Sequence, residues 1–405
     1  MGGAAVVTHR LMEALRRQGV DARMIVFSPS TDDTDYVSTY STNFRRGIKF
    51  LTERAVIYAN NGFNRENLFK VSIANVGMPL HKHPWVKETD IVALNWINQG
   101  TLSLKEIERI SKMGKPIVWT MHDMWCMTGI CHHAFECERY AGNCGNCRFL
   151  GCRKENDLSR ITWNKKKKLY NRIPIHWVPV SNWLADRCRA SSLLGNQDIT
   201  VIHNAFPTES FFTHPTVPAD QLGIPAGHDL ILFGAARIDD PIKGINYAID
   251  ALNYIFDNNP SLANKTTAVL FGNIRDRSIL DRLRFNYIYL GRVTDSLQLR
   301  QLYASAKVVL STSLYETLPG TLIEGQAAGC LPVTFGTGGQ KDIIDHLSNG
   351  YIAVYKDYED VARGIEWALS QDVDREKLHD SVNERFGATN IACRYIDLFN
   401  KLLSK

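Results

Sequence analysis

The chain contains 405 residues, of which 44% are hydrophobic and 22% are charged, and its formal net charge is +5. This length is too great for one ordinary hydrophobic core and predicts two domains, and the composition is that of a soluble globular protein. No apolar run approaches the roughly 20 residues of a membrane helix, and no signal peptide is visible, so we expect a cytoplasmic protein. The mildly basic charge suits anionic ligands or membrane surfaces.

Predicted strands and helices alternate along the chain, which favours an α/β fold with parallel sheets. In the first half, a helix is predicted over residues 4–17 and ends at Gly19. The strands that follow are expected at 23–27, 91–96, 117–121, 176–180 and 199–202. Residues 204–225 are rich in proline and threonine and are predicted to link the two domains.

His122 and Asp123 directly follow the predicted strand 117–121. Ligands of open α/β sheets bind at the carboxyl ends of strands, so this position favours a role in binding. The alternative is a loop histidine with an aspartate partner.

Six of the nine cysteines lie in the segment 126–152: Cys126, Cys131, Cys137, Cys144, Cys147 and Cys152. In a cytoplasmic protein this density favours a metal over disulfides. Zinc takes four sulfur or nitrogen ligands, which Cys137, Cys144 and Cys147 could supply together with Cys131 or a nearby histidine. Cys144 and Cys147 form a C-x2-C knuckle, but no second knuckle is present, so a compact loop of reduced thiols is the alternative.

The second half has its own set of predicted strands, at 230–233, 268–271, 288–290, 308–311, 332–335 and 351–354. The last predicted helix, over 390–403, carries an apolar face made of Ile391, Tyr395, Leu398 and Leu402.

Two basic residues, Arg237 and Lys243, lie in a loop between the strand 230–233 and a helix predicted over 244–252. Two fixed cations in such a loop can clamp a diphosphate and neutralise it as it leaves. A single basic residue in a loop is usually only solvated. The interpretation of this loop as a binding site is therefore strengthened by a second loop that also joins a strand to a helix.

That second loop follows the strand 308–311 and holds Glu316, with Gly320 at the turn into a helix predicted over 322–328. Glu324 stands in the first turn of that predicted helix. The backbone N–H groups of a helix N-terminus bind anions, and carboxylates accept hydrogen bonds from hydroxyls. The pair therefore suits a nucleotide sugar, although the pair taken alone would favour a simpler interpretation, in which Glu316 caps the helix and Glu324 is a solvated helix residue.

The chain resembles the retaining glycosyltransferases of family 4. The resemblance rests on Arg237 with Lys243, on Glu316 with Glu324, and on the sequence Thr-Met-His-Asp at 120–123. Ser-Asn-Trp at 181–183 and Val-Ile-His-Asn at 201–204 add to it. The greatest likeness is to the branch that builds bacterial surface polysaccharides, including colanic-acid-type enzymes, which carries a cysteine-rich insert after the histidine.

This resemblance implies the GT-B fold, with two Rossmann-like doubly wound domains that face a central cleft. Residues 1–208 would form the acceptor-binding domain and 209–388 the domain that binds the nucleotide-sugar donor. Residues 389–405 would form a helix that crosses back to the first domain.

The resemblance also implies site residues and a reaction. The donor would be a UDP or GDP sugar, and the acceptor a glycan or lipid-linked glycan. Departure of the nucleoside diphosphate and attack on the same face would need no metal, because Arg237 and Lys243 stabilise the leaving group. The implied catalytic residues are His122, Arg237, Lys243 and Glu316, and the implied donor-binding residues are Gly3, Gly320, Thr321, Leu322, Glu324 and Val293.

Two segments depart from the family pattern. A strand normally precedes the loop that holds Gly2 and Gly3, and here it is missing, so we expect the natural gene to start further upstream; a truncated chain is the alternative. Residues 338–342 resemble the family's glycine-rich loop, but Asp342 stands where glutamate is more usual, so the loop is assigned no role.

Two basic stretches are expected to be solvated faces. A basic helix with apolar neighbours can also rest on anionic lipid, which would suit a lipid-linked acceptor. The stretches are Lys165 to Lys168 and a segment with Phe44, Arg45, Arg46, Lys49, Phe50, Leu51, Arg54 and Ile57.

Three other functions are open at this point. A sugar-nucleotide epimerase or phosphorylase could use a similar two-domain scaffold. A zinc-containing nucleic-acid-binding protein could use the cysteines and the lysine run, although the two phosphate-type loops do not fit it and we expect no nucleic-acid partner. A non-catalytic nucleotide-sugar-binding subunit would fit the missing first strand.

Overall fold

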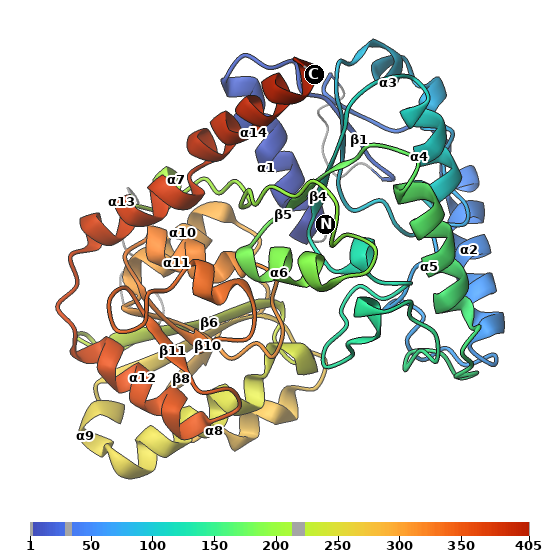
Figure 1. Ribbon diagram of the computed structural model, residues 1–405. Coiled ribbons are helices and arrows are strands. Elements are labelled where there is room, and N and C mark those ends of the chain that lie inside the picture. The colour runs from blue at the N-terminus through green and yellow to red at the C-terminus, as the bar shows by residue number, and fades with distance from the viewer. Residues whose placement is uncertain (1–2, 29–34, 213–222, 405) are drawn as a thin grey trace. The chain divides into compact units, whose positions relative to one another are not determined.

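The computed structural model describes residues 3–28, 35–212 and 223–404, and it divides into two compact units (Figure 1). The first unit comprises residues 1–204 and 392–405, and the second comprises 205–391. The predicted linker 204–225 includes residues 213–222, which lie outside the described residues. The last helix, α14 (Ala388–Leu403), begins in the second unit and continues into the first.

Parallel strands form two separate sheets in the first unit. One contains β1 (Met24–Ile25) and β2 (Val37–Ser38), and the other has the order β3–β4–β5. The bounds of its other elements are α1 (Gly3–Arg17), α2 (Asn43–Asn60), α3 (Pro84–Glu88), β3 (Val92–Leu94), α4 (Leu104–Ser111), β4 (Ile117–Met121), α5 (Leu158–Tyr170), β5 (His176–Pro179) and α6 (Asn182–Ala190).

Every residue of β4 is buried, because this strand lies in the middle of its sheet. The indole of Trp119 on β4 stacks on that of Trp177 on β5 with 5.1 Å between ring centroids. Thr120, which points to the other face, shares a 2.9 Å hydrogen bond with the hydroxyl of Tyr395 on α14. The alternation along β4 therefore ties the centre of the sheet to an aromatic core on one side and to the last helix on the other.

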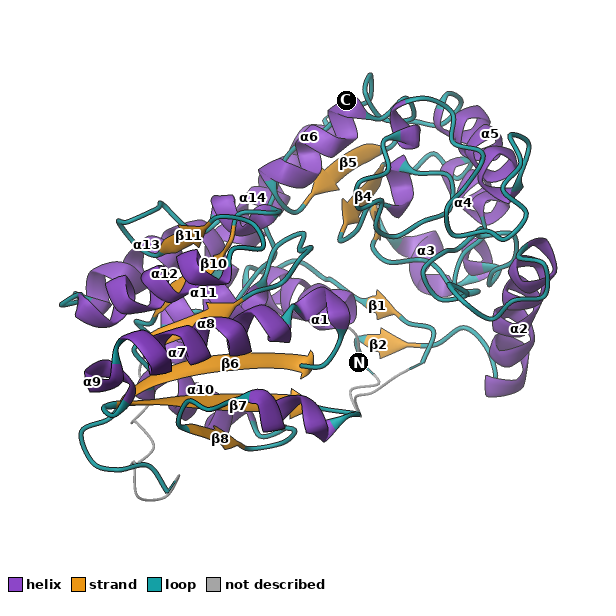
Figure 2. Ribbon diagram, turned by 90° about the horizontal axis from the view of Figure 1, so that it is seen from below, coloured by secondary structure: helices purple, strands orange, loops and turns teal. Residues whose placement is uncertain are grey.

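The second unit contains one parallel six-stranded sheet with the order β11–β10–β9–β6–β7–β8, in which β6 and β7 are the longest strands (Figure 2). This order makes it a doubly wound sheet. The element bounds are α7 (Glu209–Phe212), β6 (Asp229–Arg237), α8 (Ile245–Asn258), α9 (Pro260–Ala263), β7 (Thr266–Asn273), β8 (Tyr287–Tyr289), α10 (Ser296–Ser305), β9 (Val308–Ser311), α11 (Gly320–Ala327), β10 (Leu331–Phe335), β11 (Tyr351–Ala353), α12 (Tyr358–Ser370) and α13 (Arg375–Phe386).

Helices cover both faces of this sheet. Val308 and Leu310 of β9 belong to the core that includes residues of α8 and α12. Val309, between them, packs against Gly325 of α11, where a Cβ atom would lie 2.5 Å from the valine side chain. Because neighbouring residues of a strand face opposite sides, α11 lies on the face opposite α8 and α12.

The prediction of an α/β fold with parallel sheets is confirmed, but one predicted strand is wrong. Residues 199–202 form a single bridge, from Ile199 to Trp177, and no strand. Among the described residues, no helix is long and apolar enough to cross a membrane.

The prediction that the basic stretches are solvated is also wrong in part. Lys166 is fully buried, and its ammonium group donates to the carbonyl oxygens of Trp125 and Thr128. Arg46 and Arg54 of α2 are buried as well. Each donates to nearby oxygens, which offsets the cost of burial: Arg46 to Ser41, and Arg54 to Val71 and Ser72.

Candidate active site

The main candidate site lies where the strand order of the second unit reverses. β6 pairs with both β7 and β9, so the chain leaves β6 toward one edge of the sheet and returns beside it at β9. In open α/β sheets, ligands bind beyond the carboxyl ends of the strands at such a reversal. Arg237 ends β6, Lys243 lies in the loop that follows, and Glu316 lies in the loop after β9, so residues predicted from two separate motifs share this edge of the sheet.

Lys243 and Glu316 contact each other directly, through an ion pair between the ammonium group and one carboxylate oxygen. The backbones of the two loops are also joined, since Leu314 N–H donates to Ile242 O at 2.8 Å and the Thr312 hydroxyl donates to Gly244 O, also at 2.8 Å. Gly244 has φ of 65°, and a Cβ atom there would lie 2.1 Å from the carbonyl oxygen of Thr312. A glycine is therefore required for this close approach.

Arg237 is held by two acidic neighbours. Its guanidinium donates to Asp240 at 2.7 Å and lies 3.5 Å from Asp239. Desolvation raises the pKa of Asp239. This effect is outweighed by hydrogen bonds from the backbone N–H groups of Arg275 and Asp276 and by the charge of Arg237, so the pKa lies below its usual value. Both predicted cations thus have carboxylate partners that orient them.

The N-terminus of α11 faces the same edge of the sheet. The helix begins at Gly320, and its N-cap residue, Pro319, makes no side-chain capping bond. Gly320, Thr321 and Leu322 therefore supply the first N–H groups of the helix, which is the arrangement predicted for an anion site. Glu324 is the fifth residue of α11, so its predicted place in the first turn is wrong; it stands at the start of the second turn, because the helix begins two residues earlier than expected.

A third loop adds residues that the sequence reasoning set aside. Gly339 N–H donates to Glu316 O at 3.3 Å, and a Cβ atom on Gly338 would lie 1.8 Å from that same oxygen. The sequence signal for this contact is the Gly338–Gly339 pair. Glu316 therefore contacts Lys243 through its side chain and the glycine loop through its backbone.

Val293 follows β8 at the same edge of the sheet. Two residues before it, the carbonyl of Gly291 accepts a 2.7 Å hydrogen bond from Gly272 N–H of β7. A Cβ atom on Gly272 would lie 1.9 Å from Ala235 O of β6, so the ends of these strands are closely packed.

His122 and Asp123 lie in a pocket of the first unit, at the carboxyl end of β4. His122 Nε2 is 2.9 Å from Asn95 Oδ1. Asp123 accepts hydrogen bonds from the backbone N–H of Trp125 and from the indole of Trp96, and it lies 2.7 Å from His132 Nδ1. Sequence reasoning did not assign these partners, although Asn95 and Trp96 directly follow β3 and so share the edge with His122.

Burial lowers the pKa of His122 to about 4, against the opposing charge of Asp123. Burial raises the pKa of Asp123, but the charge and hydrogen bond of His132 outweigh it and hold that pKa at about 2. At neutral pH the site therefore presents a neutral imidazole beside an ionised carboxylate.

We predict that the His122 imidazole titrates near pH 4 in the folded protein. Because the unfolded chain takes up this proton below about pH 6.5 and the folded chain resists it, the contribution of His122 to stability is present above pH 6.5. That contribution is lost as the pH falls toward 4. Imidazole chemical shifts measured by NMR, with the signal assigned by its loss in His122→Asn, test this; a midpoint at or above pH 6.5 would refute it.

Comparison with protein families gives two matches that together cover most of the chain. The model "Glycosyl transferases group 1" matches residues 220–385, and the model "Glycosyltransferase Family 4" matches residues 1–210, more than half of the chain. The chain belongs to glycosyltransferase family 4.

A curated relative, the uncharacterised glycosyltransferase MJ1607 of Methanocaldococcus jannaschii, is 30% identical over 184 residues. This match covers 44% of the chain and 46% of the relative, so the chain spans less than half of that protein.

Solved glycosyltransferases have a similar fold. A glycosyltransferase from Rickettsia africae matches with a TM-score of 0.67 and 17% identity, over 100% of this chain and 96% of that one. HepE from Anabaena, solved with UDP, matches with a TM-score of 0.63 and 17% identity, over 99% and 96% of the two chains. These similarities, together with the two α/β units built on parallel strands, place this family 4 chain in the GT-B fold.

The predicted site residues of this family 4 chain fall in both units. Arg237, Lys243, Val293, Glu316, Glu324 and the start of α11 belong to the second, and Gly3, the first residue of α1, belongs to the first with His122. Gly2 lies outside the described residues. Cys131, Cys137, Cys144 and Cys147 also lie in the first unit, and all nine cysteines are free thiols.

Proposed function

We propose that the chain transfers a sugar from a nucleoside-diphosphate sugar to a glycan or lipid-linked glycan, with retention of configuration, in the synthesis of a surface polysaccharide. The observation that carries this proposal is the contact between Lys243 and Glu316 at the reversal of the second sheet. It joins a cation suited to phosphate and a carboxylate suited to sugar hydroxyls in one place.

The donor would bind by displacing the carboxylate of Glu316 from its ion pair with Lys243. The diphosphate would replace Glu316 at Lys243 and lie near Arg237 and the first N–H groups of α11. Glu316, released from its ion pair, would accept hydrogen bonds from the sugar, and Glu324 from the ribose. Val293 would line the pocket for the base, and Gly3 and the neutral His122 would contact the donor or the acceptor.

In the reaction, the bond between the anomeric carbon and the phosphate oxygen breaks, and an acceptor hydroxyl forms a new bond to that carbon on the same face. The acceptor proton goes to the departing phosphate oxygen. Arg237 and Lys243 stabilise the charge that develops on the diphosphate, which is the role of a fixed electrostatic environment. These two cations supply the positive charge that a metal would otherwise bring.

Release of nucleoside diphosphate from UDP and GDP sugars tests this function. HepE was solved with UDP and with UDP-glucose, so UDP sugars are the first donors to try. Turnover with one donor would support the transferase. Binding of a nucleotide without turnover over all donors and acceptors tried would favour a non-catalytic binding subunit, and absorbance from a bound pyridoxal group would favour a phosphorylase.

We further propose that α2 rests on an anionic membrane surface, where a lipid-linked acceptor would be found. Three of the four buried residues of this helix are charged: Arg46 is buried and Glu53 forms an ion pair with Arg54, while Ile57 is the fourth. The outward face is apolar, because Phe44, Ile48 and Leu51 have exposed fractions of 76%, 46% and 64%. This pattern is the reverse of an ordinary surface helix, and Arg45 and Lys49 flank the apolar stripe.

Flotation with vesicles that contain phosphatidylglycerol tests the membrane proposal. We expect Phe44→Ser with Leu51→Ser to lower binding by about tenfold or more, since each change removes apolar area from the lipid contact. Leu297→Ser, at an exposed leucine of α10, is the matched control and should bind like the unchanged chain. Equal binding by all three chains, or no binding by any of them, would contradict the proposal.

A further inference from the structure

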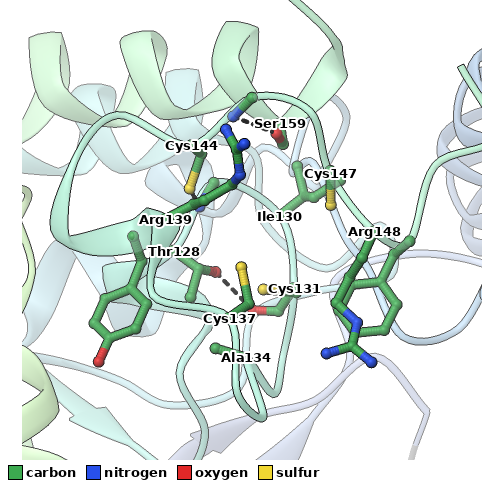
Figure 3. Close-up of a pocket in the computed structure, with 14 residues that line it drawn as sticks. Thr128, Ile130, Cys131, Ala134, Cys137, Arg139, Cys144, Cys147, Arg148 and Ser159 are labelled. Atoms are coloured by element: carbon green, nitrogen blue, oxygen red, sulfur yellow. Dashed lines mark hydrogen bonds between the residues drawn. The ribbon is translucent and has the colours of Figure 1, made fainter. Parts of the chain in front are cut away.

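Four of the six clustered cysteines line one cavity. Cys131, Cys137, Cys144 and Cys147 surround it, and Figure 3 shows their sulfur atoms around a common space. The other two cysteines of the segment are elsewhere: Cys126 is buried in the pocket of His122, and Cys152 is exposed. The cavity thus brings together the three thiols predicted as ligands, Cys137, Cys144 and Cys147, and Cys131, one of the two alternatives for the fourth ligand.

The backbone holds the thiols in this arrangement. Gly129 N–H donates to the sulfur of Cys144 at 3.2 Å. The knuckle continues through Gly145, whose φ is 88° and where a Cβ atom would lie 2.3 Å from Glu155 O. Gly145 N–H also donates to the hydroxyl of Ser159 at the start of α5, at 2.9 Å. The knuckle is therefore fixed to a helix of the first unit.

A metal ion at the centre of the cavity would hold the four sulfur atoms as thiolates, because the thiolate is the form of cysteine that binds a metal.

Cations surround the cavity. Arg139 and Arg148 line it, and the guanidinium of Arg160 donates to the carbonyl oxygen of Cys144 at 3.0 Å. Four thiolates around a divalent ion carry a net charge of minus two, which these cations would offset.

We propose that Cys131, Cys137, Cys144 and Cys147 bind one zinc ion that stabilises the segment 126–152. Within the described residues, no three His, Cys, Asp or Glu side chains already lie close enough together to hold a metal. The thiols must therefore turn toward the centre of the cavity, where a tetrahedral site brings neighbouring sulfur atoms to about 3.8 Å for Zn–S bonds of about 2.3 Å. Four thiols release four protons when the ion binds.

The chemistry favours zinc in a structural role. Four sulfur ligands fill a tetrahedral site and leave no open position for a substrate or water. Apart from two short 3-10 turns, the segment 126–152 has no helix or strand. Its Ile130, Phe149 and Leu150 pack with Ile57 and Val71, and its Met127, Ala134 and Tyr140 are buried as well. The segment also supplies His132, which contacts Asp123, so a metal would steady one wall of the His122 pocket.

Elemental analysis of protein purified without a histidine tag tests the proposal. We expect about one zinc per chain, lost in Cys144→Ser with Cys147→Ser and retained in Cys152→Ser, whose thiol is exposed and lies outside the cavity. No zinc in the unchanged chain would overturn the proposal. Zinc retained by the double variant, or iron with visible absorbance in place of zinc, would do so as well.

A second measurement uses only the unchanged protein, so it remains valid if the double variant does not fold. Alkylation of the unchanged protein, mapped by mass spectrometry, should modify Cys152 and Cys393 and spare the four cavity cysteines until a chelator removes the metal. Alkylation of all four at the same rate with and without chelator, or a disulfide between any two of them, would contradict the zinc site. Both readouts are independent of transferase activity, so this proposal and the proposed function can fail separately.

Discussion

Replacing Lys243 with methionine is expected to lower turnover by about 10²- to 10³-fold, the effect of removing one donor aimed at a charge that develops in the transition state. Methionine has a similar length but no charge, and the backbone bond from Leu314 to Ile242 stays in place. Steady-state release of nucleoside diphosphate measures the effect. The change should appear mainly in kcat, because the developing charge of the leaving group is greatest in the transition state.

Two further variants separate this effect from a structural one. Arg284 forms an exposed ion pair with Asp257 in the same unit, so Arg284→Gln removes a cation without touching the site and should keep full activity. Glu316→Gln removes the partner of Lys243 but keeps its length, and it should also reduce turnover, because Glu316 is expected to hold the sugar. Full activity in Lys243→Met would place the phosphate-binding cation elsewhere.

Removing Arg54 is expected to destabilise the first unit by about 3–5 kcal/mol, the usual cost of leaving a buried charge without its partner. Glu53 is fully buried and accepts hydrogen bonds from the backbone N–H groups of Ile73 and Ala74, at 2.8 and 3.0 Å. Its other carboxylate oxygen lies 3.1 Å from Arg54. Arg54→Met therefore leaves a buried carboxylate without its cation.

Urea unfolding followed by tryptophan fluorescence measures this loss. Lys49→Met, on the same helix outside the ion pair, is the matched control and should unfold like the unchanged chain within about 0.5 kcal/mol. Glu53→Gln with Arg54→Met should recover part of the loss, because the double variant no longer buries an unpaired charge. Unfolding of Arg54→Met at the same urea concentration as the unchanged chain would show that Glu53 does not depend on this partner.

Local sequence predicted most strands and the loops that follow them, because their signals are local. Apolar runs such as 230–233 and 308–311 followed by glycine-containing turns are sufficient to place a strand and the loop after it. The pairing of Lys243 with Glu316 could not be read in this way. The two residues are 73 positions apart, and only the strand order β9–β6 brings their loops together.

The burial of charged residues could not be predicted from local sequence either. Lys166 stands in a run of four lysines, and Arg46 and Arg54 stand beside solvated basic residues, so composition alone predicted exposed faces. Their burial depends on carbonyl oxygens of distant segments, such as Trp125 for Lys166 and Val71 for Arg54. The same applies to His132, whose contact with Asp123 depends on how the cysteine-rich segment folds back on β4.

Isothermal titration calorimetry with UDP and GDP tests the central claim, that the reversal of the second sheet binds a nucleoside diphosphate. One nucleotide is expected to bind with one site per chain, with affinity reduced about tenfold or more in Lys243→Met and unchanged in Arg284→Gln. Binding that is equal in all three proteins would place the nucleotide elsewhere. Absence of binding by either nucleotide to the folded, unchanged chain would contradict the account.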